Sequence, residues 1–172
     1  MGILTRFGTD RTHLSRGRRG DLGIGHGEKV LAVGVEFETG ELLVATTHAL
    51  YPGVAKQRIR WDQISKAAWV EPMLTATLID GSGATSGVMT WELKQAADLP
   101  AAVHDRVMAS VVVTERMELA PGASALLVAR QNSDDGEIWW AVVFEAGVDP
   151  NDRSLLALAD IALNQMRDSL GV

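Results

Sequence analysis

The sequence lacks cysteine and long hydrophobic runs, and each absence excludes a class of protein. None of its 172 residues is cysteine, which excludes a disulfide framework, a thiolate nucleophile and a zinc or iron–sulfur site with cysteine ligands. No stretch reaches the roughly 18 to 20 apolar residues of a membrane-spanning helix, and residues 1–20 are polar and arginine-rich, unlike a secretory signal. We therefore expect a soluble, cytoplasmic protein with no transmembrane segment.

Positive charge is outnumbered in this acidic chain and is concentrated at its N-terminal end. The formal net charge is -6, yet residues 1–20 contain five arginines and one aspartate, which gives them about +4 and leaves about -10 for the remainder. An acidic body repels nucleic acid, so we expect no nucleic-acid partner. The basic end is suited to phosphate groups or an anionic lipid surface, with Arg16, Arg18 and Arg19 as candidate ligand-binding residues.

The hydrophobic pattern divides the chain into three parts. Residues 1–27 are rich in glycine and polar residues, which predicts a flexible basic arm. Residues 28–109 alternate in short runs and then recur at four-residue spacing, which predicts seven strands and one helix. Residues 110–172 predict three antiparallel strands and a helix, packed on the first domain or on a partner chain. The expected strands cover residues 28–37, 41–47, 48–51, 56–61, 67–70, 73–79, 87–93, 110–119, 124–131 and 137–145, and the expected helices cover residues 98–109 and 150–170.

The segment SVVVTERMEL, residues 110–119, fits either a continuation of the preceding helix or a new strand. Its three consecutive valines and its threonine favour the strand, because β-branched side chains are stiff in a helix and fit a pleated surface. We therefore predict a strand.

The segment EIWWAVVFE, residues 137–145, is apolar on both faces of the strand that it predicts. Alternation places Trp139 and Trp140 on opposite faces, each among apolar neighbours. Since a sheet with one solvated face would alternate with polar residues, each face must be covered. We expect the C-terminal helix on one face and the N-terminal domain or a second subunit on the other. Trp139 and Trp140 are thus candidate interface residues, each no more than about half exposed.

The segment RIRWDQISKAAW, residues 58–69, combines basic and aromatic residues. Alternation places Ile59 and Trp61 on an inner face and Arg58 and Arg60 on an outer face. We interpret Trp61 as a core residue. Arg58 and Arg60 are candidate residues for binding an anionic ligand on the outer face.

The segment Leu42 to Tyr51, followed by Ile59 to Ala68, resembles the bacterial pleckstrin-homology-like (PH-like) domains, which are close in fold to the GRAM domains. In that family a strand LLVTxxRLxY precedes a basic and aromatic segment IPYxxIxxV. Where many relatives carry a basic pair, this chain has Thr47-His48-Ala49. The N-terminal region is also similar to uncharacterised proteins of high-GC Gram-positive bacteria.

The resemblance covers roughly residues 28–109 and implies a seven-stranded, partly open barrel with a capping helix. With the C-terminal part added, the expected fold class is α+β, mainly antiparallel β. The barrel is expected to be followed by a three-stranded antiparallel sheet with a C-terminal helix.

No catalytic or metal-binding constellation emerges from the sequence. The four histidines fall in separate segments without a second ligand at metal spacing. The glycine run at residues 20–27 precedes a strand, whereas nucleotide-binding glycines follow a strand and open a helix. We therefore expect no metal, no cofactor and no enzymatic activity.

Three hypotheses about function remain open. The first is a non-catalytic module that binds a protein, a peptide or a second copy of itself. The second is binding of an anionic lipid or a phosphate ligand through Arg58, Arg60 and the basic arm. The third is an enzyme without a recognisable local motif, which a deep pocket holding several titratable groups with shifted pKa values would favour.

Overall fold

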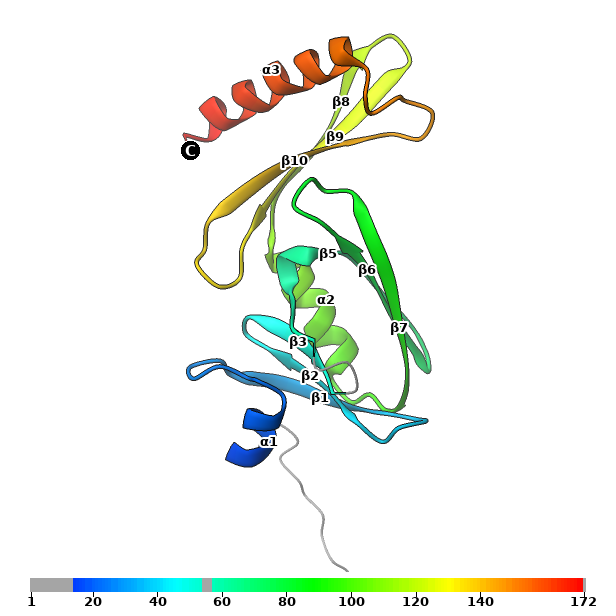
Figure 1. The fold of residues 1–172 in the computed structure, drawn as a ribbon, viewed down its shortest axis with the longest axis vertical. Coiled ribbons are helices and arrows are strands. Elements are labelled where there is room, and N and C mark those ends of the chain that lie inside the picture. Colours follow the sequence, from blue (N-terminus) through cyan, green and yellow to red (C-terminus); the bar gives the residue numbers. More distant parts are fainter. Residues whose placement is uncertain (1–13, 54–56, 172) are drawn as a thin grey trace, which may run out of the picture.

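The computed structural model describes residues 14–53 and 57–171, which form two antiparallel sheets and three α-helices (Figure 1). This α+β architecture of mainly antiparallel strands is the predicted fold class. None of the helices in these ranges has the length and apolarity needed to cross a bilayer. The elements are α1 (Arg16–Asp21), β1 (Val30–Glu36), β2 (Leu42–Thr46), β3 (Ala49–Pro52), β4 (Ile59–Arg60), the 3-10 helix η1 (Trp61–Gln63), β5 (Ile64–Val70), β6 (Met73–Ile79), β7 (Thr85–Gln95), α2 (Leu99–Ala109), β8 (Val111–Ala120), β9 (Ala123–Gln131), β10 (Ile138–Phe144) and α3 (Arg153–Leu170).

The first sheet contains seven strands in the order β4-β3-β2-β1-β7-β6-β5. Strand β1 joins its two halves, because it pairs antiparallel with β2 on one side and with β7 on the other. Within the described ranges the outermost strands β4 and β5 do not pair, so the sheet is not closed into a barrel. The expected partly open barrel is thus an open sheet, with α2 lying between its two halves (Figure 1).

Helix α2 covers the inner face of the first sheet. Its residues Leu99, Val103 and Val107 recur at four-residue spacing and are all buried, in one core with Trp61. The helix approaches β1 closely at Gly34, where an added Cβ atom would lie 2.6 Å from Cδ2 of Leu99. A larger residue at position 34 would therefore force the Leu99 side chain to shift and would also crowd the backbone oxygen of Gln95, 3.2 Å from the added Cβ atom.

The second sheet has the order β10-β9-β8 and carries α3 on one face. Leu127 of β9 is fully buried against Ala162 and Met166 of α3. The helix begins after Asp152, whose carboxylate accepts hydrogen bonds from the first backbone N–H groups, and ends at Gly171 in the left-handed conformation. Residues 110–119 were predicted as a strand, and β8 confirms that prediction.

The first difference from the sequence-based expectation lies before β1. We expected an irregular, flexible arm over residues 1–27, but Arg16–Asp21 fold into α1. The Ser15 hydroxyl caps this helix by accepting a hydrogen bond from the Arg18 N–H at 3.3 Å. Beyond the helix, Ile24 is buried against Tyr51 and other apolar residues of the first domain. Residues 1–13 of the expected arm lie outside the described residues.

The second difference concerns the strand expected at residues 56–61. Strand β4 covers only Ile59–Arg60, because the chain turns into η1 at Trp61, and β5 starts directly afterwards at Ile64. The turn is closed by the Gln63 carboxamide, which accepts a hydrogen bond from the Arg60 N–H at 3.0 Å. As a result both Trp61 and Asp62 are fully buried. Position 56 lies outside the described residues.

Candidate functional site

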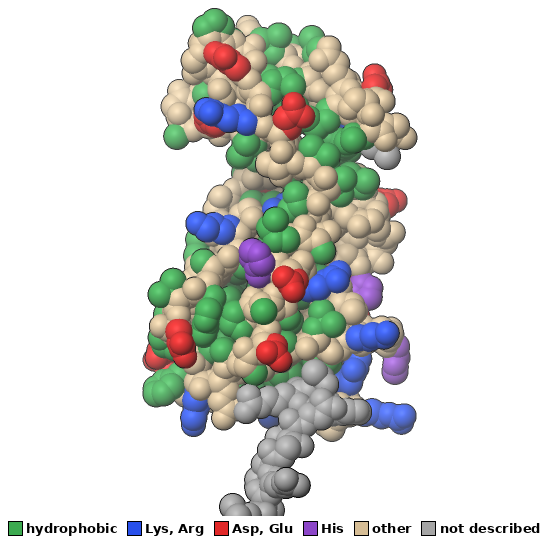
Figure 2. Space-filling view, turned by 180° about the vertical axis from the view of Figure 1, so that it is seen from behind, with side chains coloured by type: hydrophobic (Ala, Val, Ile, Leu, Met, Phe, Trp, Pro, Cys, Tyr) green, Lys and Arg blue, Asp and Glu red, His purple; other side chains and the backbone are tan. Residues whose placement is uncertain are grey.

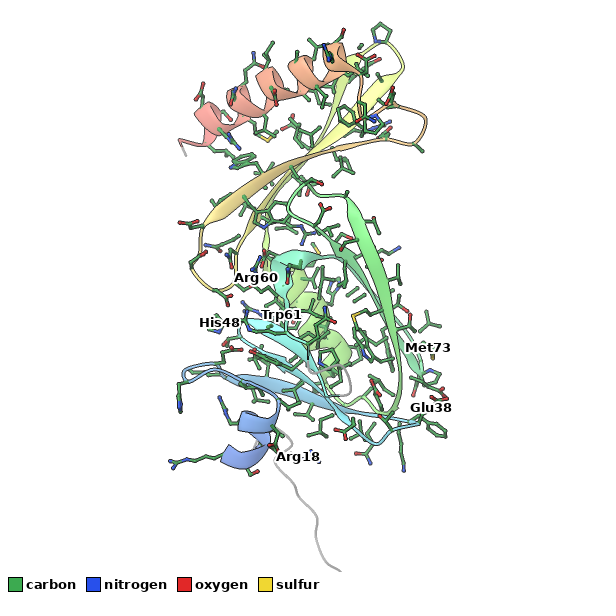
Figure 3. The ribbon with its side chains drawn as sticks, in the orientation of Figure 1. Arg18, Glu38, His48, Arg60, Trp61 and Met73 are labelled. Atoms are coloured by element: carbon green, nitrogen blue, oxygen red, sulfur yellow. The ribbon has the colours of Figure 1, made fainter. Side chains whose placement is uncertain are left out.

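The two sheets meet at a polar junction centred on the carboxylate of Asp62, which is fully buried. Arg60 donates to it from Nε at 3.1 Å and from Nη2 at 3.0 Å. The indole Nε1 of Trp139 donates at 3.0 Å and the backbone N–H of Ser133 at 3.4 Å. Donors from β4 and from the β9–β10 hairpin therefore converge on one carboxylate, and this convergence ties the second sheet to the first. Figure 3 labels Arg60 at this junction.

A second ionic contact crosses the same junction at Arg58. Its guanidinium pairs with the carboxylate of Asp134 in the β9–β10 hairpin, with Nη1 donating to Oδ2 at 2.8 Å and Nη2 donating to Oδ1. Its Nε also donates to the hydroxyl of Tyr51 at 2.9 Å, and that hydroxyl donates to Glu28 at 2.7 Å. The hydrogen bonds from Arg58 lower the pKa of Asp134, which stays ionised in the pair.

The structure shows where the basic and aromatic residues of the segment RIRWDQISKAAW, residues 58–69, lie. Ile59 and Trp61 belong to the core, as predicted, with exposures of 2% and 0%. Arg58 and Arg60, the candidate ligand-binding residues of the outer face, both pair with carboxylates of this chain. Their positive charges are thus compensated within the molecule, and the geometry gives them a structural role at the junction.

The tryptophan pair follows the predicted arrangement. The Trp139 side chain points toward the first domain, where it meets Asp62. The Trp140 side chain points the other way and packs with α3, where the guanidinium carbon of Arg167 lies 5.5 Å from the ring centroid. The two indoles therefore lie on opposite faces of β10, as predicted. Both residues are partly buried, which agrees with the predicted exposure of no more than about half. The first sheet's side of the junction thus covers the Trp139 indole, and α3 covers the Trp140 indole.

A buried arginine of β9 completes the junction, and sequence analysis did not identify it. Arg130 is 5% exposed and reaches into the first domain, where it donates to the backbone oxygens of Ile64 at 2.8 Å and Ser65 at 3.3 Å. It also donates to the hydroxyl of Ser110 at 3.1 Å. Burial lowers the pKa of Arg130. The signal in the sequence was a single arginine inside the apolar run SALLVARQ.

The candidate ligand-binding residues of the arm lie at the other end of the first domain. Arg16, Arg19 and His26 line a hollow of about 660 Å³ together with Ile24 and three glycines, and we call it the basic hollow: Arg16, Arg19, Gly20, Ile24, Gly25, His26 and Gly27. Arg18 lies on the same short helix and is exposed. Figure 2 shows Lys, Arg and His side chains gathered on one side of this lower end of the molecule.

The basic hollow is held in shape by contacts to the first sheet. Nη2 of Arg19 donates to the backbone oxygen of Glu28 at 2.6 Å, which ties α1 to the start of β1. The Glu28 carboxylate accepts hydrogen bonds from the Tyr51 hydroxyl at 2.7 Å and from the Thr46 hydroxyl at 2.6 Å. Through Tyr51, Glu28 is also linked to Arg58 at the junction. In the described part of the chain, no three His, Asp or Glu side chains cluster as a metal site would require.

Replacing Asp62 tests the junction. Asp62→Ala leaves the Trp139 indole N–H and the Arg60 guanidinium without their acceptor, so we expect a loss of about 2–4 kcal/mol in the free energy of unfolding. Urea unfolding followed by tryptophan fluorescence measures it. The control is Asp105→Ala on the exposed face of α2, whose free energy of unfolding should stay within about 0.5 kcal/mol of the wild-type value. Equal stability of the two variants would contradict a structural role for the Asp62 carboxylate.

The single tyrosine of the chain permits a second test of the network. Burial and the hydrogen bond to Glu28 raise the pKa of Tyr51 to about 12. Absorbance at alkaline pH should therefore show phenolate forming well above its ordinary pKa near 10 in the folded protein, and near 10 in denaturant. Because the folded pKa is raised, this contribution to stability is complete below about pH 10 and is lost as the pH rises toward 12. A folded titration at the ordinary pKa would contradict the buried hydrogen bond.

Comparison of the chain with protein-family models, with curated proteins and with solved structures gives no match. No relative therefore supplies a ligand, a reaction or a site residue for this chain. What it does has to be inferred from its own basic hollow, junction and exposed surfaces.

Proposed function

We propose that this chain is a non-catalytic binding module of the PH-like type, and that the basic hollow binds a ligand carrying phosphate groups. The order of the seven strands and the helix that follows β7 agree with the PH-like resemblance. The observation that carries the ligand proposal is the convergence of Arg16, Arg19 and His26 on one hollow of about 660 Å³. Two guanidinium groups and an imidazole in one hollow are suited to a phosphate dianion.

Two of the three glycines of the basic hollow leave room for close approach by such a ligand, whereas Gly25 lies beside the Glu28 carboxylate. At Gly20 and Gly27 an added Cβ atom would meet nothing within 4 Å, so the space beside the backbone is open. Gly27 adopts a φ of +97°, a conformation that other residues rarely adopt, so glycine is required there for the path of the chain. Phosphate oxygens could therefore approach both the side chains and the backbone of this segment.

The distribution of charge supports this location over the outer strand face. Arg58 and Arg60 are paired with Asp134 and Asp62, so they add little net positive charge to their surroundings. Arg16 and Arg18 are exposed on α1 at the basic end of an acidic chain. An anion approaching this molecule is therefore attracted mainly toward α1.

Removing two exposed arginines of α1 tests the proposal. The double variant Arg16→Gln, Arg18→Gln should weaken binding of a phosphate-bearing probe roughly 30-fold, because each arginine near an anionic surface contributes about 1 kcal/mol and about 1.4 kcal/mol is tenfold in affinity. The probes are inorganic pyrophosphate, measured by calorimetry, and phosphatidylcholine vesicles with about 10% phosphatidylinositol bisphosphate, measured by co-sedimentation. Binding should weaken as the ionic strength rises from about 0.05 to 0.3 M. Pyrophosphate binding alone would identify a soluble ligand, and vesicle binding alone a membrane headgroup.

A matched control removes the same charge elsewhere. Lys66→Gln, Arg153→Gln lowers the net charge equally at two exposed positions away from α1, where neither cation pairs with a carboxylate of the described residues, and it should bind both probes like the wild type. If neither probe binds the wild type at the lower ionic strength, the proposal fails. Equal weakening in both double variants would point to a general charge effect and would also reject the basic hollow as the site.

A second candidate function, binding of a protein or a second copy, is favoured by the outer face of β5, β6 and β7. Val70 and Val88 are exposed by 74% and 62%, and Met73 and Phe37 by 37% and 61%. The pairings of Val70 with Met73 and of Thr77 with Val88 place Val70, Met73 and Val88 on one face of the sheet, where Figure 3 labels Met73. Phe37 follows the end of β1 and is not part of these strand pairings. Exposed apolar side chains that share one sheet face are typical of protein contacts.

Self-association is the simplest form of this second candidate. Light scattering after size-exclusion chromatography at about 50 µM should then give a dimer, a concentration at which a modest interface is populated. Val70→Lys, Val88→Lys should convert it to a monomer, because two buried ammonium groups would lack partners. Val112→Lys on β8, where the valine is 43% exposed, is the control and should remain dimeric. A monomeric wild type at this concentration would exclude self-association through this face.

A further inference from the structure

A small cavity lies where the second sheet faces the first domain. It has a volume of about 260 Å³ and is reached between the β6–β7 hairpin, β5 and the face of the second sheet opposite α3. Its walls include the apolar side chains of Ile79, Leu126, Val128 and Val143. Arg130, the buried arginine of the junction, also lines it. The cavity thus combines apolar walls, three hydroxyl-bearing residues (Ser65, Thr85 and Thr114) and a single cationic group.

The guanidinium of Arg130 is only partly satisfied by the protein. Of its five N–H groups, three donate to the oxygens of Ile64, Ser65 and Ser110. Its Nε is buried and has no hydrogen-bond acceptor among the described residues. One hydrogen on Nη2 also remains without an acceptor. A carboxylate could bind the Nε–Nη2 edge bidentately once the atoms that cover the buried Nε move aside.

The charge of Arg130 is likewise uncompensated at short range. Among the described residues no carboxylate lies within 4.0 Å of its nitrogens. Asp62 attracts it from farther away, but the oxygens of Asp62 are already bonded to Arg60, Trp139 and Ser133. A buried cation without an ion-pair partner is unfavourable, so an anion of the right size entering this cavity would gain a strong interaction.

We propose that this cavity binds a small monocarboxylate with an apolar tail, with the carboxylate against Arg130 and the tail among Leu126, Val128 and Val143. One guanidinium matches one negative charge, and apolar walls disfavour a second charge. At about 30 Å³ for each water-sized group, the volume of about 260 Å³ holds roughly eight to nine such groups, and because the cavity is open on one side it can accommodate an acid of up to about eight carbons, which has about ten non-hydrogen atoms. This inference concerns a different site from the basic hollow and does not depend on it.

Close packing at Gly83 explains how the cavity is bounded on the side of the β6–β7 hairpin. An added Cβ atom at this position would lie 2.7 Å from Cβ of Ala141 and 3.0 Å from Cγ2 of Val143. Its φ of +82° also favours glycine. The hairpin tip can therefore rest on β10 and narrow the cavity without filling it.

Titration of the full chain with octanoate, followed by methyl NMR, tests the proposal. We expect saturable binding with a dissociation constant below about 1 mM, a realistic affinity for ten non-hydrogen atoms. The shifts should concentrate on the methyl groups of Leu126, Val128 and Val143. Octanol, which has the same tail without the charge, should bind at least about tenfold more weakly, because charge-assisted hydrogen bonds are the stronger ones. Equal affinity for octanol, or no saturable shifts with octanoate, would overturn the proposal.

Two variants distinguish binding in the cavity from binding elsewhere on the protein. Val128→Trp fills the cavity while retaining Arg130 and should abolish octanoate binding. Ile161→Trp adds the same indole at an exposed position of α3, on the other side of the second sheet, and should leave octanoate binding unchanged. If Val128→Trp loses its cooperative unfolding transition, Leu126→Phe takes its place, and the comparison of octanoate with octanol on the wild type remains decisive. Octanoate binding unaffected by a filled cavity would place the ligand elsewhere and reject the assignment.

Discussion

The arrangement of the two sheets depends on the buried carboxylate of Asp62. A fully buried charge is tolerated only when it is paired and its oxygens are hydrogen-bonded. Its donors come from both sides of the junction: Arg60 from the first domain, and Trp139 and the N–H of Ser133 from the second. Any displacement of the second sheet would break donor contacts to a charge that water cannot reach. The position of the second sheet is therefore set by hydrogen-bond geometry as well as by apolar packing.

Each sheet's part of the chain contributes a buried charged group that is bound by the other part. The first domain presents the Asp62 carboxylate to the indole of Trp139, and the second sends the Arg130 guanidinium to the backbone oxygens of Ile64 and Ser65. These hydrogen bonds are directional, so they specify orientation more narrowly than apolar contact alone. The two buried groups differ in one respect, because the carboxylate has an ion-pair partner at short range and Arg130, within the described ranges, has none.

Local patterns predicted the strands well, whereas the charged contacts could not be predicted from them. Alternation and β-branched residues identified ten strand segments, including β8, because both signals act over a few neighbouring residues. Helix α1 was missed because its sequence RGRRGD contains two glycines and forms a helix only with the Ser15 cap and the docking of Ile24. Arg58 pairs with Asp134 across 76 positions, and Trp139 reaches Asp62 across 77. Nothing in the alternation of a single strand encodes such pairings.

The ion pairing and the burial of each arginine determine which kind of anion it can bind. Arg58 and Arg60 are compensated by carboxylates and stabilise the junction. Arg16 and Arg18 are exposed, so each contributes a weak, salt-screened attraction, and recognition there favours a ligand with several negative charges. Arg130 is a single, almost fully buried cation, so it interacts strongly with one negative charge, whereas a second negative charge would remain uncompensated. Burial thus determines how many negative charges each arginine can compensate, and this is why the proposed ligand is phosphate-bearing at the basic hollow and a monoanion with an apolar tail at the cavity.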